Sequence, residues 1–114
     1  PLIFIQDRPL VALRDCLFIS QEDFKGGAML AEHVLDLGAR RLLFVRSAVD
    51  WPAVQERQNG IRSVVEKWHG ANLAVIKVED ESIDTTQKAL REHFGNSSFL
   101  PDAILCGNDN LAVA

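Results

Sequence analysis

Short apolar runs recur along the chain and alternate with longer segments of helical periodicity. The runs lie at residues 2–5, 16–19, 42–45, 73–78 and 103–106. Runs of this length that lack a polar residue at every second position are typical of strands buried on both faces of a parallel sheet. This feature constrains the fold most, because such a sheet needs helices on its faces.

Helices are predicted in the intervening segments, at residues 24–37, 52–68 and 85–94. In the first of them Ala31 and Leu35 share an apolar face, and Gly38 stands where a helix ends. Gly26 and Gly27 are poor helix formers in its first turn, which indicates close backbone packing or room for a ligand. One-for-one alternation of helices and strands implies right-handed crossovers. The sequence therefore predicts an α/β fold with an open, mainly parallel sheet flanked by helices.

Size and charge limit the function of the chain. It has 114 residues, of which 47% are hydrophobic, and a net charge of −4. That is enough for one core, and the acidic balance argues against this segment being a nucleic-acid-binding surface. A DNA-binding module elsewhere in a longer protein is still compatible with it. Because the chain stops where a new helix begins after Asp109, we expect a fragment.

Membrane, metal and cofactor roles find no support in the sequence. No apolar run approaches the ~20 residues of a membrane span, and no basic leader precedes the first strand. Cys16 and Cys106 lack metal-site spacing and are interpreted as buried thiols of a reducing compartment. There is no phosphate-binding loop, nucleophile elbow or zinc-protease motif. We therefore expect no cofactor, no metal and no enzymatic activity.

Polar side chains follow the predicted strands at their carboxyl ends, where open parallel sheets bind ligands. Carboxylates, an amide, an arginine and an indole suit a pocket for a sugar or a small polar metabolite. Each has a simpler alternative, such as a turn, a surface ion pair, a loop contact or a helix cap. The residues are Asp7 and Arg8, Glu22 and Asp23, Ser47, Asp50 and Trp51, and Asn108 and Asp109, with Arg57 about one turn into the following helix.

Several of these residues stand in segments that resemble the LacI/GalR family of bacterial transcriptional regulators. The resemblance covers nearly the whole chain, in order and at similar spacing. The segments are Asp7-Arg8-Pro9, Gly26-Gly27-Ala28, Ala31-Glu32-His33, Leu35-Asp36-Leu37-Gly38-Ala39-Arg40-Arg41, Glu56-Arg57-Gln58-Asn59-Gly60, and Pro101-Asp102-Ala103-Ile104 leading to Asn108-Asp109.

The resemblance implies a periplasmic-binding-protein-like (type I) effector domain, of which this chain holds an incomplete part. Residues 1–15 would be the last strand of the N-terminal subdomain and the crossover, and residues 16–114 a truncated C-terminal subdomain. It further implies a cytoplasmic homodimer that senses a small sugar-like effector. Operator DNA would be bound through a helix-turn-helix headpiece absent from this chain.

The resemblance also assigns effector-binding residues. Arg57 matches the family's effector-binding arginine, Asn108 an amide at the far strand with Asp109 beside it, and Asp7 a polar residue of the N-terminal side. Ser47 and Trp51 complete the predicted site from their positions at the strand end. Arg46 departs from the family's small residues and leaves room for an acidic or phosphorylated effector. The alternatives are a periplasmic sugar-binding receptor of the same fold and a small α/β enzyme.

Overall fold

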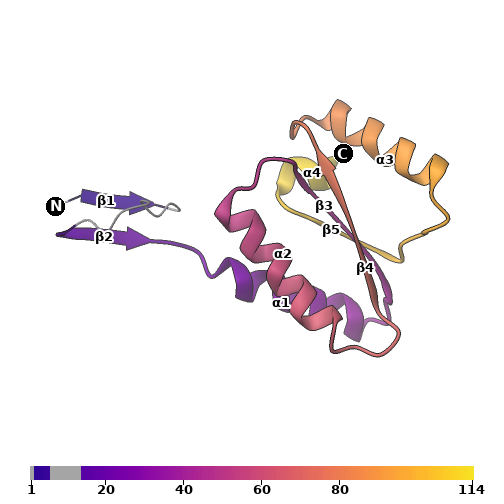
Figure 1. Cartoon of the computed structure of the whole chain (residues 1–114), viewed down its shortest axis with the longest axis horizontal. Helices are drawn as coiled ribbons and strands as arrows, with labels where there is room; N and C mark the ends of the chain where they lie inside the picture. The colour runs from indigo at the N-terminus through magenta and orange to yellow at the C-terminus, as the bar shows by residue number, and fades with distance from the viewer. Residues whose placement is uncertain (1, 6–13) are drawn as a thin grey trace.

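The computed structural model describes residues 2–5 and 14–114, so Asp7 and Arg8 lie outside the described residues. The chain alternates strands and helices after its first two strands (Figure 1). The elements are β1 (Leu2–Ile5), β2 (Cys16–Ile19), α1 (Asp23–Asp36), β3 (Arg41–Ser47), α2 (Pro52–Val65), β4 (Asn72–Val78), α3 (Ile83–Asn96), β5 (Ala103–Cys106) and α4 (Asp109–Val113).

Strands β4, β3 and β5 form a three-stranded sheet in that order, and all its pairs are parallel. In the central strand Leu43 lies opposite Ala74 of β4 and Ile104 of β5. Strand β3 is buried from Leu42 to Ser47, as expected of a central strand with both faces covered. The predicted α/β class with an open parallel sheet is therefore confirmed.

Helices cover both faces of this sheet, α1 and α2 on one side and α3 and α4 on the other (Figure 1). Successive side chains of a strand point to opposite faces. Leu42 and Phe44 accordingly pack into the cluster that α1 and α2 cover. Leu43 and Val45 belong to a second cluster with Leu111 of α4. The parity of β3 thus decides which helices each of its residues meets.

Helices α1 and α2 approach closely at two glycines. A Cβ atom on Gly27 would overlap the carbonyl oxygen of Arg57, and one on Gly60 would overlap the carbonyl oxygen of Phe24. The close-packing interpretation is therefore correct for Gly27, whereas Gly26 has no atom near its Cβ position. At such a crossing even one methyl group would push the two backbones apart.

The helix ends agree in part with prediction. Gly38 has a φ of +102° directly after α1, the left-handed conformation of a helix-terminating glycine. The cap of α3 is Ser82, whose hydroxyl accepts a hydrogen bond from the backbone N–H of Thr85. Asp84, which its place directly before the predicted helix 85–94 suggests as that cap, lies within the first turn instead.

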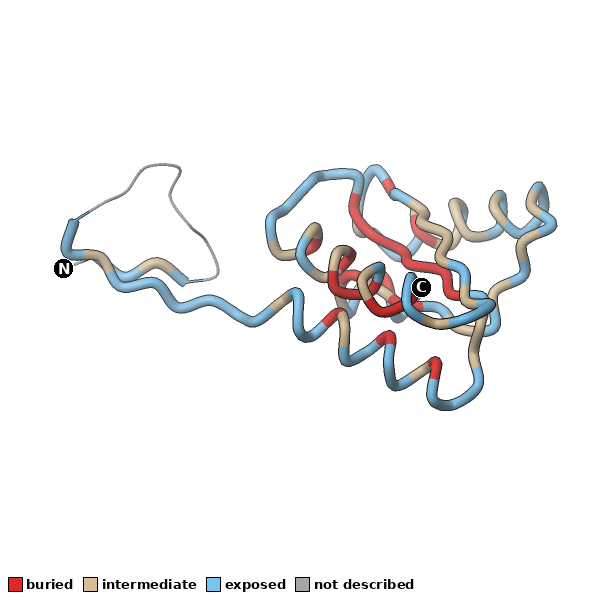
Figure 2. The backbone as a smooth tube through the Cα atoms, turned by 60° about the horizontal axis from the view of Figure 1, so that its bottom comes forward, coloured by how far each residue is buried: buried red, intermediate tan, exposed pale blue. Residues whose placement is uncertain are grey.

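Strands β1 and β2 form a separate parallel pair, with Phe4 stacked on Phe18 at 5.3 Å between ring centroids. An extended, exposed segment connects the pair to α1 (Figure 2). The radius of gyration of 15.9 Å exceeds the ~13 Å expected of a compact chain of this length. Because β2 pairs with β1, residues 16–19 belong to a sheet distinct from β4-β3-β5.

Candidate ligand-binding site

Arg57 lies where three parts of the fold meet. Its Nε donates to Oδ1 of Asp23 in α1 at 2.8 Å, and its two terminal nitrogens donate to the carbonyl oxygen of Gly107, at 2.5 Å, and to Oε1 of Gln21, at 3.1 Å. Gly107 directly follows β5, and Gln21 lies in the segment between β2 and α1. Arg57 therefore joins α2 to the end of the sheet, to α1 and to the connecting segment.

A cavity of about 340 Å³ opens beside this arginine, at the carboxyl ends of the strands. It brings together three of the predicted site residues, Trp51, Arg57 and Asn108. Its wall consists of Gln21, Asp23, Trp51, Pro52, Ala53, Val54, Arg57, Glu81, Gly107 and Asn108. A second cavity of about 320 Å³ also includes Arg57 in its wall, together with Gly26, Gly27 and Cys106.

The remaining predicted residues stand elsewhere. Ser47 is buried and does not line this cavity, and its hydroxyl accepts a hydrogen bond from the backbone N–H of Val49. Asp109 is exposed in the first turn of α4 and is also absent from the wall. Asp7 lies outside the described residues. The effector-binding role of each remains a prediction.

Asn108 combines the two roles that the sequence left open for it. Its Oδ1 accepts a hydrogen bond from the backbone N–H of Leu111 at 3.0 Å, which makes it the N-cap of α4. It also lines the cavity. The cap occupies the side-chain oxygen, so the amide N–H₂ group is the part left for a ligand.

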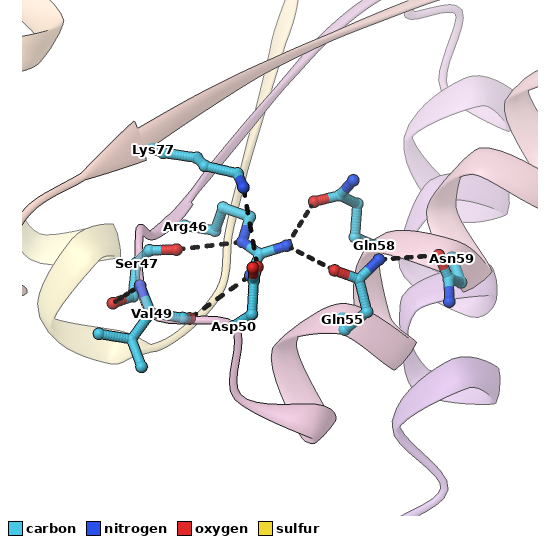
Figure 3. A network of polar contacts seen from close by, with 8 residues as sticks. All are labelled: Arg46, Ser47, Val49, Asp50, Gln55, Gln58, Asn59 and Lys77. Atoms are coloured by element: carbon cyan, nitrogen blue, oxygen red, sulfur yellow. Dashed lines mark hydrogen bonds and ion pairs between the residues drawn. The ribbon is translucent and has the colours of Figure 1, made fainter.

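Arg46, which the sequence suggested as a pocket cation, is buried within the protein and bonded there (Figure 3). Its Nε donates to the carbonyl oxygen of Ser47. One terminal nitrogen donates to the amide oxygens of Gln55 and Gln58, at 3.0 and 2.8 Å. The other donates to Val49 O and, at 2.6 Å, to Oδ1 of Asp50, which also pairs with Lys77.

This network positions the loop that carries Trp51. Asp50, a candidate cap from its place two residues before Pro52, does not cap α2, because its carboxylate binds Arg46. Trp51 is the N-cap residue, without a side-chain bond. The backbone N–H of Ala48 donates to the carbonyl oxygen of Val78, which fixes the loop to β4. The 57% exposed Trp51 therefore stands on a loop whose base is held by buried hydrogen bonds.

Two wall residues, Gln21 and Glu81, were missed by sequence reasoning. Glu81 belongs to the acidic run Glu79-Asp80-Glu81, which the sequence suggests is a solvated loop. The run directly follows β4, so the rule that ligands bind at the carboxyl ends of strands was the signal for it. Gln21 follows β2 closely and stands beside Glu22 and Asp23, so the same rule pointed to it.

Three groups have displaced pKa values. Hydrogen bonds from Ser82 and Thr85 lower the pKa of Asp80. Partial burial alone would raise the pKa of Asp102, but backbone N–H bonds from Arg41 and Arg40 and the charge of Arg41 together lower it. Burial raises the pKa of the Cys106 thiol, which lines the second cavity. Both cysteines, which were predicted to be buried, are half-buried free thiols.

Within the described ranges, 2–5 and 14–114, no helix is long and apolar enough to cross a bilayer. Over the same residues, no group of three or more histidine, cysteine, aspartate or glutamate side chains is arranged to hold a metal ion.

Several solved structures have a similar fold. No protein-family model matches the sequence. A LacI family transcriptional regulator from Enterococcus faecium with bound ribose has a TM-score of 0.80 and 20% identity over 98% of this chain. The Cra transcriptional dual regulator from Pseudomonas putida, in complex with fructose 1-phosphate, gives 0.74 and 19% over 93%. A PurR family transcriptional regulator from Vibrio parahaemolyticus gives 0.75 and 18% over 99%.

These likenesses define the class of fold. The chain has the periplasmic-binding-protein-like fold of LacI-family regulators, which confirms the fold implied by the sequence resemblance. It spans about 40% of the length of those structures, namely 40%, 38% and 42%. The matched part therefore corresponds to a portion of such a regulator.

Proposed function

We propose that this chain is part of the effector-binding domain of a LacI-type transcriptional regulator, and that the cavity beside Arg57 holds one side of a small sugar-like effector. The observation that carries the proposal is the convergence of Trp51, Arg57 and Asn108 on one cavity at the strand ends. Sugar pockets need planar hydrogen-bonding groups and an aromatic face, and these three side chains supply them. The structural neighbours with bound ribose and fructose 1-phosphate add support.

The proposed mechanism is a population shift between two closure states, without catalysis. Residues 1–15 are assigned to the N-terminal subdomain and the crossover, and residues 16–114 to the C-terminal subdomain. The pairing of β2 with β1 favours a boundary a few residues later, before α1. An effector held between the subdomains would favour one closure angle and so alter operator binding by a cytoplasmic homodimer. A coupling free energy of ~1–3 kcal/mol is sufficient for such control.

Arg57 suits this mechanism because it bonds to the segment that connects the two sheets as well as to the end of the main sheet. It contacts Gln21 in the segment that leads from β2 to α1, and Gly107 at the end of the sheet. A ligand that binds Arg57 would thus contact a residue that already holds the segment between the two sheets. Two of the five guanidinium N–H groups are not used within the described part of the chain, so they can bind ligand hydroxyls.

The test uses the whole protein that carries this chain, in a thermal-shift screen of D-ribose, D-fructose and related sugars. Binding raises the melting temperature by mass action. Calorimetry on Arg57→Ala should then show affinity at least about ten-fold weaker, on the scale of charged hydrogen bonds. Arg62→Ala is the matched control, since Arg62 is exposed near the other end of α2. Unchanged affinity in Arg57→Ala would rule out the proposed site.

A periplasmic transport receptor has the same fold, and a DNA-binding assay separates it from a regulator. Specific operator binding that changes when the sugar is added supports the regulator. Sugar binding without any DNA binding by the whole protein would favour the receptor. Turnover of a bound sugar would contradict both.

A further inference from the structure

We infer that the cavity beside Arg57 selects an uncharged, polyhydroxylated ligand and discriminates against phosphorylated or carboxylated forms of it. The inference rests on the proposed function and adds the chemical class of the effector. It follows from the charges around the cavity, because each nearby cation is already paired and one carboxylate is not.

The charge of Arg57 is balanced within the wall itself. Its guanidinium pairs with Asp23 at 2.8 Å, and the Asp23 side chain is only 14% exposed. The carbonyl oxygen of Gly107 accepts a further bond from the same guanidinium. A phosphate could accept from the two spare N–H groups, but it would share one cation with the Asp23 carboxylate and be repelled by that like charge at close range. A hydroxyl group can accept from the remaining N–H groups without displacing anything.

The other nearby cations are also unavailable. All five N–H groups of Arg46 are directed to acceptors inside the protein, and Arg46 is not part of the wall. Lys77 lies 3.7 Å from the carboxylate of Asp50, which in turn binds Arg46. Arg46, which the sequence suggested could leave room for an acidic effector, is therefore not placed to bind one in this cavity.

Glu81 tips the balance towards negative charge. It is half-buried in the wall, and no ion pair or hydrogen bond of its carboxylate occurs among residues 2–5 and 14–114. The opposing contribution is the N-terminus of α2, which carries about half a positive charge. Pro52 at its first position has no N–H group to offer an anion. One full carboxylate therefore outweighs the helix terminus.

The rest of the wall suits a neutral ligand. The amide N–H₂ groups of Gln21 and Asn108 donate hydrogen bonds without net charge, and Trp51 offers an aromatic face. Apolar faces of sugar rings pack on such indoles, while their hydroxyl groups meet amides and the spare N–H groups of Arg57. The cavity volume of about 340 Å³ is at the lower end for small-molecule sites, which fits a single sugar ring.

The experiment compares matched pairs of probes on the whole protein by calorimetry: D-ribose with D-ribose 5-phosphate, and D-fructose with D-fructose 1-phosphate. The neutral member should bind at least about ten-fold tighter, as one unscreened charge in a half-buried site predicts. Raising the salt concentration should leave its affinity unchanged. Tighter binding of the phosphorylated member would overturn the inference while leaving the proposed function intact. Failure of every sugar to bind would overturn both.

A variant pair locates the discrimination. Glu81→Gln keeps the shape of the side chain and removes its charge, so the preference for the neutral sugar should narrow at least about five-fold. Glu66→Gln is the matched control, because Glu66 is exposed at the far end of α2. If Glu81→Gln still binds the neutral sugar and prefers it over the phosphorylated sugar as strongly as the wild type does, Glu81 does not cause the preference. That result would overturn the role assigned to Glu81.

Discussion

Replacing Arg46 with methionine should destabilise the protein by about 2–4 kcal/mol, because the network around it depends on one guanidinium. Arg46 lies in the central strand with no solvent exposure and donates five hydrogen bonds, to Ser47, Val49, Asp50, Gln55 and Gln58. Methionine keeps an unbranched apolar side chain at this site but supplies no donor. All five acceptors then lose their hydrogen bond from Arg46, and Asp50 keeps its ion pair with Lys77.

The magnitude depends on which acceptors can reach water. Gln58 is only 7% exposed and Ser47 only 3%, so the Gln58 amide oxygen and the Ser47 carbonyl would each cost about 1–3 kcal/mol when unpaired. Asp50 is 64% exposed on its side chain and can be hydrated, so its loss adds little. Relief from burying a cation returns part of the cost. The net destabilisation is therefore lower than the ~3–5 kcal/mol lost when one partner of a buried ion pair is removed and the other charge stays buried.

A second substitution distinguishes the loss of hydrogen bonds from a simple packing defect. Adding Gln58→Leu to Arg46→Met removes the buried orphan oxygen, so about 1 kcal/mol or more of the loss should return. A packing defect would instead deepen when a second core residue is changed. Arg62→Met, on the exposed part of α2, is the matched control and should change stability by less than about 0.5 kcal/mol.

The assay is urea unfolding of the whole protein, followed by tryptophan fluorescence. With a slope of about 2 kcal/mol/M, the expected loss lowers the midpoint by about 1–2 M. Trp51 stands at the end of the loop that Arg46 holds, so its emission in the native baseline should also change. A midpoint within about 0.3 M of wild type, or no recovery in the double variant, would refute the account.

Two further predictions concern packing and pH. Gly60→Ala should destabilise the protein by about 2 kcal/mol or more, because its Cβ would overlap the carbonyl oxygen of Phe24. Gly26 has open space around its Cβ position, so Gly26→Ala should leave the stability unchanged or raise it by up to ~1 kcal/mol in the same urea assay. The pKa of Asp102 is lower in the folded protein than its unfolded value near 3.8. The Asp102 carboxylate therefore stabilises the fold above that pH, and this stabilisation is lost as the pH falls through the folded pKa. In thermal unfolding, the stability advantage of the wild type over Asp102→Asn should shrink below about pH 4.

The alternation of apolar runs and helices was enough to predict the sheet and its parallel pairing. An apolar run such as residues 42–45 is buried only if helices pack on both faces of its sheet. The regular alternation of strands and helices leaves few topologies that place helices on both faces. The separate pairing of β1 with β2 could not be predicted in this way. Residues 2–5 and 16–19 are as apolar as the strands of the main sheet, and the composition of a strand does not show which other strand it pairs with.

The structure brings the predicted residues to the cavity where backbone position alone decides their place, and puts them elsewhere where side-chain direction decides it. Ser47 follows Val45 by two residues and so shares its face of the sheet, away from α2. Strand parity therefore already argued against Ser47 as a neighbour of Arg57. Parity also directs Arg46 towards α2, where it meets Gln58.

Gln58 was the overlooked signal for the buried network. It occupies the apolar stripe of α2 between Val54 and Ile61, four residues after one and three before the other. A glutamine on such a stripe needs a buried partner, because an unpaired amide in a core is costly. Arg46 is that partner at 2.8 Å, but only the folded chain brings residues 46 and 58 together.

The crossing of α1 and α2 connects the packing of the fold to the charge of the cavity. Asp23 stands four residues before Gly27, and Arg57 three residues before Gly60, so each is about one turn from the close contact on its own helix. The approach that only glycine permits thus carries Asp23 to within 2.8 Å of Arg57. The pairing that makes the cavity unreceptive to anions is therefore a consequence of helix packing, and it exists before any ligand binds.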